Sequence, residues 1–222
     1  MLSPADCGII FDLDGVIVDT TTYHYESFRV LGEEEGYAIS PEIFRSIFGR
    51  HNSDIFPILY GHPLPAEEVQ RLADRKEACF RDMLRGKVRA LPGVAELLPA
   101  LRDAGFHLAI GSSTPRANID MILGELGFTG YFQAIASAED VTEGKPNPLV
   151  FLTAAARLGI PPKRCVVIED AVAGVQAALN GGMQAVGVTT NHPRASLSHA
   201  HRVVDSLAEL TPRDLLELLC RA

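Results

Sequence analysis

Two aspartates, Asp12 and Asp14, lie two residues apart near the N-terminus of this 222-residue chain. They follow the apolar run Gly8–Phe11, which is typical of a fully buried strand, and Gly15 directly after them favours a tight turn. Paired carboxylates at a strand end can hold a metal ion, attack an electrophile or exchange protons. Asp and Gly also form ordinary turns, so the pair alone leaves both interpretations open. An EF-hand calcium loop does not fit, because a third oxygen ligand and the closing Glu are missing.

Three further polar groups follow later apolar runs or lie in a turn. They are Ser112-Ser113-Thr114, Lys145 between Gly144 and Pro146, and Glu169-Asp170. Taken singly, each has an ordinary explanation as a helix cap or a solvated surface residue. A strand-to-helix turn with hydroxyl groups can also bind an anion. Four ordinary explanations would all have to hold at one sheet edge, so we interpret the four groups as one site.

The elements that would bring these groups together are predicted by alternating apolar runs and helix-period segments. Strands are expected at Gly8–Phe11, His107–Ile110, Ala134–Ala136, Cys165–Ile168, Ala185–Val188 and Arg202–Val204. Helices are expected at Pro92–Ala104, Pro115–Leu126, Pro148–Leu158, Ala171–Asn180 and Thr211–Cys220. This alternation predicts an α/β fold with a doubly wound, Rossmann-like parallel sheet that helices cover on both faces.

One segment, residues 21–88, breaks the alternation. It contains helix-like stretches and no convincing strand: Tyr23–Glu35, Pro41–Phe48, Asn52–Tyr60 and Pro65–Arg85. We interpret residues 21–88 as an inserted α-helical cap domain and residues 1–20 and 89–222 as the catalytic core. An insertion after the first strand is expected over the carboxyl ends of the strands, where it would act as a lid.

Composition narrows the class of partner. The chain has 20 Lys and Arg against 28 Asp and Glu, a net charge of −8, and is 47% hydrophobic. With no basic cluster, we expect neither nucleic acid nor an anionic membrane as its partner. No apolar run approaches the roughly 20 residues of a membrane span, and the N-terminus does not resemble a signal peptide. The four cysteines form no CxxC pair, so a reduced, cytoplasmic protein is expected.

The order of the motifs resembles the haloacid dehalogenase superfamily, and the resemblance covers nearly the whole chain. The matching residues are Asp12-x-Asp14-Gly15-Val16, then Ser112, Lys145-Pro146 and Glu169-Asp170, with a helical cap after the first motif. The resemblance implies Asp12 as nucleophile, Asp14 as general acid and base, and Ser112 and Lys145 as ligands of the phosphoryl group. It also implies Mg²⁺ as cofactor, held by Asp12, the Asp14 backbone carbonyl, Glu169 and Asp170.

The chemistry of phosphate esters agrees with these implied roles. A carboxylate can attack a phosphate dianion only if the repulsion is neutralised, which Mg²⁺ and the Lys145 ammonium would do. Asp14 supplies a proton donor. The dehalogenases of the superfamily lack an acid at the position of Asp14 and also lack the metal, and its phosphonate-cleaving members typically have a small residue at that position. Dehalogenase and phosphonate-cleaving activities are therefore disfavoured. A binding protein without catalysis would need neither Asp12 nor Asp14.

Within the superfamily, residues 11–20 and Tyr23-His24 look most like the branch that contains β-phosphoglucomutase and small sugar-phosphate phosphatases. The resemblance implies that Thr20 and His24 help to position the general acid. The alternative for His24 is an ordinary histidine on a helix surface.

The cap loop departs from the mutase pattern. The mutase has a Lys before the loop Gly and an Arg three residues after it, which grip a second phosphate, and this chain has Phe48 and Asn52 there. Arg50 and His51 are candidate contacts to substrate, as is Ser113 in the core, although Arg50 has the alternative of being solvated. We therefore expect a phosphatase acting on a small-molecule phosphate ester, with a phosphomutase as the alternative. The sequence predicts neither the particular substrate nor the oligomeric state.

Overall fold

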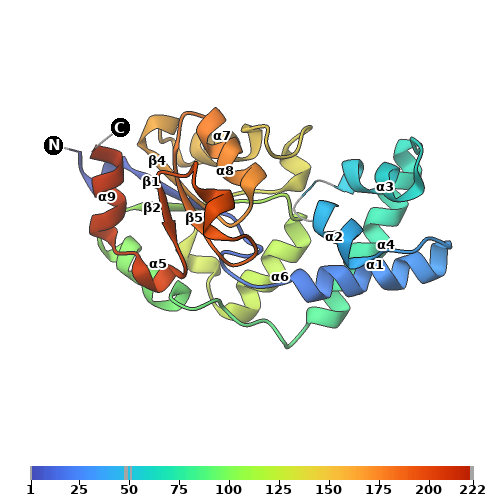
Figure 1. Ribbon diagram of the computed structural model, residues 1–222. Coiled ribbons are helices and arrows are strands. Elements are labelled where there is room, and N and C mark those ends of the chain that lie inside the picture. The colour runs from blue at the N-terminus through green and yellow to red at the C-terminus, as the bar shows by residue number, and fades with distance from the viewer. Residues whose placement is uncertain (1, 48–49, 51, 221–222) are drawn as a thin grey trace. The chain divides into compact units, whose positions relative to one another are not determined.

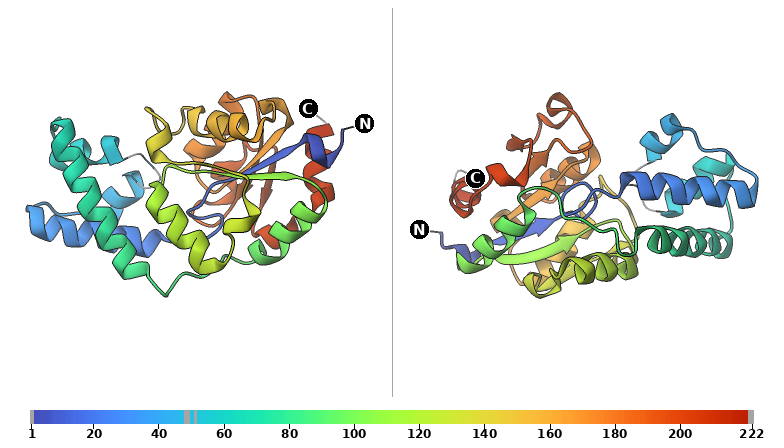
Figure 2. Two further views of the ribbon diagram at one scale, coloured as in Figure 1. Left: turned by 180° about the vertical axis from the view of Figure 1, so that it is seen from behind. Right: turned by 90° about the horizontal axis from the view of Figure 1, so that it is seen from below.

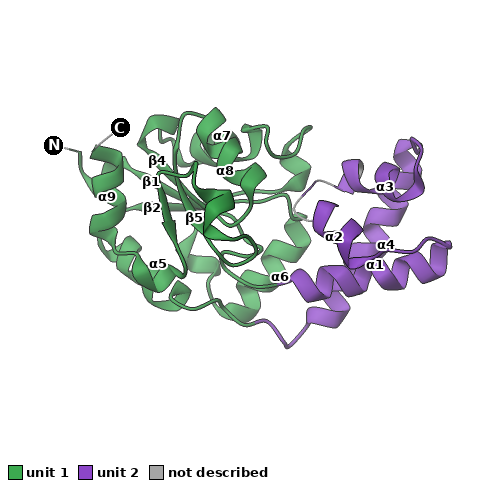
Figure 3. Cartoon of the chain, in the orientation of Figure 1, with its two compact units in different colours: residues 1–19, 89–222 green, residues 20–88 purple. Residues whose placement is uncertain are grey.

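The computed structural model describes residues 2–47, 50 and 52–220. The chain divides into two compact units, which Figure 3 colours separately. Met1–Asp19 and Arg89–Ala222 form one, called here the core unit, and Thr20–Val88 forms the other, the cap unit. Thr20, which the sequence analysis assigned to the core, is the first residue of the cap unit.

The described residues of the core unit form a six-stranded parallel sheet with the order β3-β2-β1-β4-β5-β6 (Figure 1). The strands are β1 (Gly8–Phe11), β2 (His107–Gly111), β3 (Ala134–Ala136), β4 (Cys165–Glu169), β5 (Gln184–Val188) and β6 (Arg202–Val204). Every residue of the central strands β1 and β4 is buried. Apart from Glu169 at the end of β4, these strands are unbroken apolar runs, because helices cover both faces of the sheet.

Helices lie on both faces of this sheet (Figures 1 and 2). α7 (Leu149–Leu158) and α8 (Val172–Asn180) pack against each other on one face. α5 (Val94–Asp103), α6 (Arg116–Leu126) and α9 (Pro212–Cys220) lie on the other face. Short 3₁₀ helices complete the unit: η1 (Pro4–Asp6), η2 (Thr129–Tyr131), η3 (Ala138–Asp140), η4 (Pro162–Arg164), η5 (Arg194–Leu197) and η6 (Leu207–Glu209).

The cap unit is helical throughout its described elements. It contains α1 (Thr21–Glu35), α2 (Pro41–Ile47), α3 (Asn52–Tyr60) and α4 (Ala66–Leu84). α1 packs along α4, and apolar side chains from all four helices form a separate hydrophobic core, among them Phe28, Phe44, Phe56 and Leu72. The predicted α/β fold with a parallel sheet and a helical insertion is confirmed. Phe48, predicted as the end of the second cap helix, lies outside the described residues.

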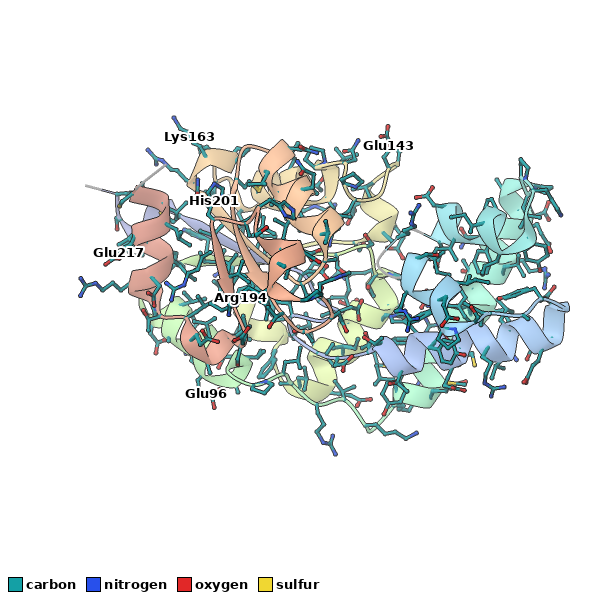
Figure 4. The ribbon with its side chains drawn as sticks, viewed as in Figure 1. Glu96, Glu143, Lys163, Arg194, His201 and Glu217 are labelled. Carbon is teal, nitrogen blue, oxygen red and sulfur yellow. The ribbon has the colours of Figure 1, made fainter. Side chains whose placement is uncertain are left out.

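Charged side chains of both signs project from the surface of the core unit. Figure 4 labels Glu96, Glu143, Lys163, Arg194 and Glu217 among them, and each of these residues is exposed. Among the described helices, none is both long and apolar enough to cross a membrane.

Candidate active site

The register of the sheet brings the predicted site residues to one edge. Phe11, the last residue of β1, pairs with Ile110 of β2 on one side and with Ile168 of β4 on the other. Asp12 follows directly, and its backbone N–H donates to the Ile168 carbonyl at 3.0 Å. Residues that follow β1, β2 and β4 therefore lie side by side at the carboxyl ends of the strands, where open α/β sheets bind ligands.

Lys145 is buried between two carboxylates of this edge. Its Nζ donates to Asp12 Oδ1 at 2.9 Å and to Glu169 Oε1 at 2.6 Å, and it lies 4.8 Å from the centroid of the Phe151 ring. Only 5% of the Lys145 side chain is exposed. The alternative of a solvated surface lysine is therefore wrong, and the ammonium group is held in place by charge and by an aromatic face.

Three buried carboxylates lie together at this edge, and two of them contact the Lys145 ammonium. Asp12, Glu169 and Asp170 each offer an oxygen atom within 4.8 Å of the others. Burial raises the pKa of Asp12 to about 7, although Lys145 opposes the shift. Burial also raises the pKa of Asp170, and the neighbouring charges of Glu169 and Asp12 add to that effect. Such a group is stabilised by a bound cation, because like charges at this separation disfavour joint ionisation.

The pKa of Lys145 moves in the opposite direction. Burial lowers it, but the charges of Asp12 and Glu169 and their hydrogen bonds outweigh burial, so the pKa lies above its usual range. Lys145 therefore keeps its positive charge at neutral pH. A buried, permanently charged ammonium beside a carboxylate is suited to hold an anionic phosphoryl group.

Asp170 is not the N-cap of α8, which was the alternative considered for it. The N-cap of α8 is Ala171, whose N–H donates to Glu169 Oε2 at 2.5 Å, so Glu169 anchors the turn before the helix. Asp170 Oδ2 instead accepts a hydrogen bond from Asn191 Nδ2 at 2.7 Å. Asp170 therefore has no capping role, and its carboxylate faces the cluster of acidic groups.

Two glycines leave room for these carboxylates. A Cβ atom on Gly15, whose φ is +80°, would lie 2.1 Å from Asp170 Oδ2. A Cβ atom on Gly174 would lie 1.8 Å from Glu169 Oε1. Any side chain at either position would displace a carboxylate of the cluster. Close backbone approach together with three buried oxygen donors fits a small, hard cation such as Mg²⁺.

Asp14 and the residues after β2 complete the edge. The Thr114 hydroxyl donates to Asp14 Oδ2, and the Thr114 N–H donates to Ser112 Oγ at 3.3 Å. The Ser112 N–H donates to the Ala136 carbonyl at 3.0 Å, which ties this turn to β3. Ser112 is buried and Ser113 is half-buried. The segment 112–114 thus lies beside Asp14, and the Ser112 and Thr114 hydroxyl groups take part in hydrogen bonds.

Three of the remaining predicted residues, Thr20, His24 and Arg50, belong to the cap unit. Thr20 is fully buried there. His24 is buried too, with Nδ1 2.6 Å from Lys76 Nζ and its ring stacked on Phe80 at 4.0 Å between centroids, so the alternative of a surface histidine is wrong. Arg50 is exposed, and its Nε donates to the Ser46 carbonyl at 3.1 Å. His51 lies outside the described residues.

Three polar side chains of these clusters were missed by the sequence analysis as site residues. Asn191 lies in a turn after β5 and belongs to no motif, and Thr114 was read only as part of a polar run. Glu77 is buried beside Lys76 in α4, a helix with many other charged residues. The contacts of these side chains join residues far apart in the sequence, so they become visible only in the folded chain.

A parallel sheet that ends in buried carboxylates around one lysine, with an inserted helical unit, defines a class of phosphate-handling hydrolases. The family described as haloacid dehalogenase-like hydrolase matches residues 9–188. The chain belongs to this family, in the branch of β-phosphoglucomutase and the sugar-phosphate phosphatases. The predicted enzyme class, a phosphatase or hydrolase of this family, is confirmed.

Individual relatives lie in the same branch. The crystal structure of β-phosphoglucomutase from Clostridium difficile is 30% identical, with a TM-score of 0.86 over 96% of this chain and 97% of that one. A phosphorylated carbohydrates phosphatase of Thermotoga maritima is 29% identical over 95% of this chain and 97% of its own. The chloroplastic 5-amino-6-(5-phospho-D-ribitylamino)uracil phosphatase of Arabidopsis thaliana is 32% identical over 95% of this chain. That match spans only 57% of the plant protein.

Proposed function

We propose that this chain is a Mg²⁺-dependent phosphomonoesterase that hydrolyses a small phosphorylated metabolite, in particular a sugar phosphate, through a phosphoryl group carried on Asp12. The observation that carries the proposal is the buried Lys145, which bridges Asp12 and Glu169 at the carboxyl ends of the strands. One ammonium and several carboxylates at a sheet edge suit a dianionic phosphate and a metal ion together.

The residues would have separate roles in the reaction. Asp12, the Asp14 backbone carbonyl, Glu169 and Asp170 are proposed to hold Mg²⁺, which would neutralise charge on the phosphoryl oxygens. Asp12 attacks phosphorus, so that its new O–P bond replaces the bond to the alcohol oxygen, and the Asp14 carboxyl gives that oxygen a proton. Asp14 then takes a proton from a water molecule that attacks the phosphoaspartate and releases phosphate.

Residues around these groups position the phosphoryl group and the acid. Lys145 and the Ser112 hydroxyl are proposed ligands of the phosphoryl oxygens, with Ser113 beside them. The Thr114 hydroxyl donates to Asp14 Oδ2, which supports a role in orienting that carboxyl group. Hydrolysis needs Asp14 in both protonation states in turn, and a neighbouring hydroxyl can donate to the ionised form and accept from the protonated form.

The similarity to β-phosphoglucomutase favours a second candidate, a phosphomutase. Contacts inside the cap unit favour the phosphatase. Asn52, which replaces an arginine of the mutase pattern, donates from Nδ2 to Glu77 Oε1 at 3.0 Å. The Lys76 ammonium donates to the same oxygen at 2.9 Å, so its charge is paired. A neutral amide committed to a carboxylate is poorly suited to grip a second phosphate dianion.

The substrate class rests on the cap and on the relatives. Enzymes of this branch act on phosphorylated sugars and on a ribitylamino phosphate, by the names of the relatives above. Thr20, His24, Arg50 and His51 are proposed to select the leaving group, with the cap unit acting as a lid. The cytoplasmic location stays a prediction.

A screen of phosphorylated metabolites for phosphate release, with MgCl₂ or with EDTA, tests the proposal. We expect release from hexose or pentose monophosphates in MgCl₂ and none in EDTA. Release that is equal in both conditions would contradict the metal requirement. A hexose monophosphate supplied with its bisphosphate separates the candidates, because a mutase yields isomerised sugar phosphate whereas a phosphatase yields free phosphate.

A further inference from the structure

We infer that Asn191 is a positioning residue that orients the Asp170 carboxylate for the metal ion. The inference rests on the proposed Mg²⁺ site and extends it to a fifth segment of the chain, the turn after β5, which none of the sequence motifs includes. Asn191 does not itself touch the substrate in this scheme. It acts through Asp170.

The sheet brings this turn to the site. β5 lies next to β4, and Gly187 of β5 pairs with Glu169 at the end of β4. The turn at 189–192 therefore follows β5 at the same edge as the Glu169-Asp170 pair. From this turn the Asn191 Nδ2 group donates to Asp170 Oδ2 at 2.7 Å, a short and well-formed hydrogen bond between residues 21 positions apart.

The Asp14-Gly15 turn closes around the same contact. A Cβ atom on Gly15 would lie 2.8 Å from Asn191 Nδ2 and 2.1 Å from Asp170 Oδ2. The amide, the carboxylate and the Gly15 backbone are thus in close contact, and each comes from a different loop. The Asp14 carbonyl, a proposed metal ligand, belongs to that same turn.

An amide suits this position better than a charged donor. Asp170 is 3% exposed and lies beside two further carboxylates, so its oxygens need donors. Lys145 donates to Asp12 and Glu169. Asn191 gives Asp170 a hydrogen bond but leaves its negative charge for the cation. A hydrogen bond to Oδ2 restricts the rotation of the carboxylate and so limits the directions that Oδ1 can take.

The alternative is that Asn191 is merely a turn residue. Asn is common in turns, and this one precedes His192-Pro193. A turn residue would affect folding alone, whereas a positioning residue would change the affinity for Mg²⁺ in the folded protein. Thr189 in the same turn offers a matched control, because its hydroxyl donates to Asp205 Oδ1 at 2.8 Å, a carboxylate outside the site.

Titration of MgCl₂ into the substrate-free protein by isothermal calorimetry tests the inference. Asn191→Leu keeps the size of the side chain and removes the donor, and we expect its Kd for Mg²⁺ to rise on the order of tenfold or more. Thr189→Val should bind Mg²⁺ as the wild type does. With p-nitrophenyl phosphate at saturating Mg²⁺, the factor by which kcat falls in Asn191→Leu should be smaller than the factor by which its Kd for Mg²⁺ rises.

Unchanged Mg²⁺ affinity in Asn191→Leu would overturn the inference, as would equal losses in Asn191→Leu and Thr189→Val. If circular dichroism shows that the leucine variant is unfolded, Asn191→Ala takes its place, and wild-type affinity in that variant overturns the inference too. A wild type that binds no Mg²⁺ would overturn the metal site itself and this inference with it. Failure of the proposed function is thereby distinguished from failure of the Asn191 contact alone.

Discussion

Each unit of the chain buries one lysine, and the two lysines have different surroundings. In the core unit, Lys145 contacts Asp12 and Glu169, and Asp170 lies in the same group of acidic oxygens. In the cap unit, Lys76 is 2% exposed and contacts the single carboxylate of Glu77 and the His24 ring. The core cluster has an excess of negative charge, whereas the cap cluster is balanced.

The pKa values of the carboxyl groups shift in opposite directions in the two clusters. Burial raises the pKa of Asp12 to about 7 and raises that of Asp170 as well. Burial also acts to raise the pKa of Glu77, but the Lys76 charge and the hydrogen bond from Asn52 outweigh it and hold that pKa below its usual range. Breaking a balanced buried pair leaves an uncompensated charge and destabilises the fold, whereas a cluster with excess negative charge is suited to bind a cation.

The largest expected effect concerns catalysis in the unbalanced cluster. Asp12→Asn should lower the rate of p-nitrophenyl phosphate hydrolysis on the order of a thousandfold or more, because it removes the nucleophile. It should not lower the melting temperature in EDTA, since a neutral amide replaces one of the crowded carboxylates. Rapid-quench mass spectrometry of the wild type should find labile phosphate on Asp12.

Two results would contradict this view of the core cluster. A rate above about one hundredth of the wild type would mean that Asp12 is not the nucleophile. A large drop in the melting temperature in EDTA would mean that the ionised Asp12 carboxylate stabilises the fold. We expect that role only for the Glu77 carboxylate of the cap unit.

In the cap unit the same kind of change should destabilise the protein. Glu77→Gln leaves the Lys76 ammonium buried without its carboxylate, so the free energy of unfolding in urea should fall by about 3 kcal/mol. The double variant Lys76→Met/Glu77→Leu removes both charges and should lie much closer to the wild type. A loss under about 1 kcal/mol for Glu77→Gln would show that the Lys76 ammonium does not depend on the Glu77 carboxylate, as in a solvent-exposed pair.

Mg²⁺ should stabilise the core cluster and leave the cap cluster unaffected. At a concentration a hundredfold above its Kd, a ligand that binds only the folded state adds about 2.7 kcal/mol to the stability. The melting temperature should therefore rise with MgCl₂ in the wild type and in Glu77→Gln, but not in Asp170→Ala. A rise of equal size in Asp170→Ala would place the Mg²⁺ site elsewhere.

This contrast also shows what the sequence could predict. Residues directly after apolar strands, such as Asp12 and Asp170, were assigned to one edge because parallel strands end together. Lys76 was not recognised as a buried polar residue, because its partner His24 is 52 positions away. Asn191 was missed since the side chain that it contacts depends on the exact path of a turn. Element types and their approximate bounds follow from local patterns, whereas pairwise contacts between turns do not.

A third ion pair, between Arg157 of α7 and Asp140 of η3, separates the effect of balance from the effect of burial. Arg157 Nη1 and Nη2 donate to the two Asp140 oxygens at 2.8 and 2.5 Å, and their side chains are 41% and 24% exposed. Hydrogen bonds from Arg157 hold the pKa of Asp140 below its usual range. The pair is balanced like the one in the cap, but water screens it.

The smallest predicted effect follows from that exposure. Because the pKa of Asp140 is lowered in the folded state, its stabilisation is present above the usual Asp pKa of about 4 and is lost as the pH falls below it. Asp140→Asn should therefore cost about 1 kcal/mol in the free energy of unfolding at about pH 7, and less at about pH 3. Urea unfolding of both proteins at the two pH values measures this. A cost that is the same at both pH values would mean that Asp140 stabilises the fold through the hydrogen bonds that it accepts from Ser137 and not through its charge. The comparison with the Lys76–Glu77 pair would then no longer isolate the effect of burial.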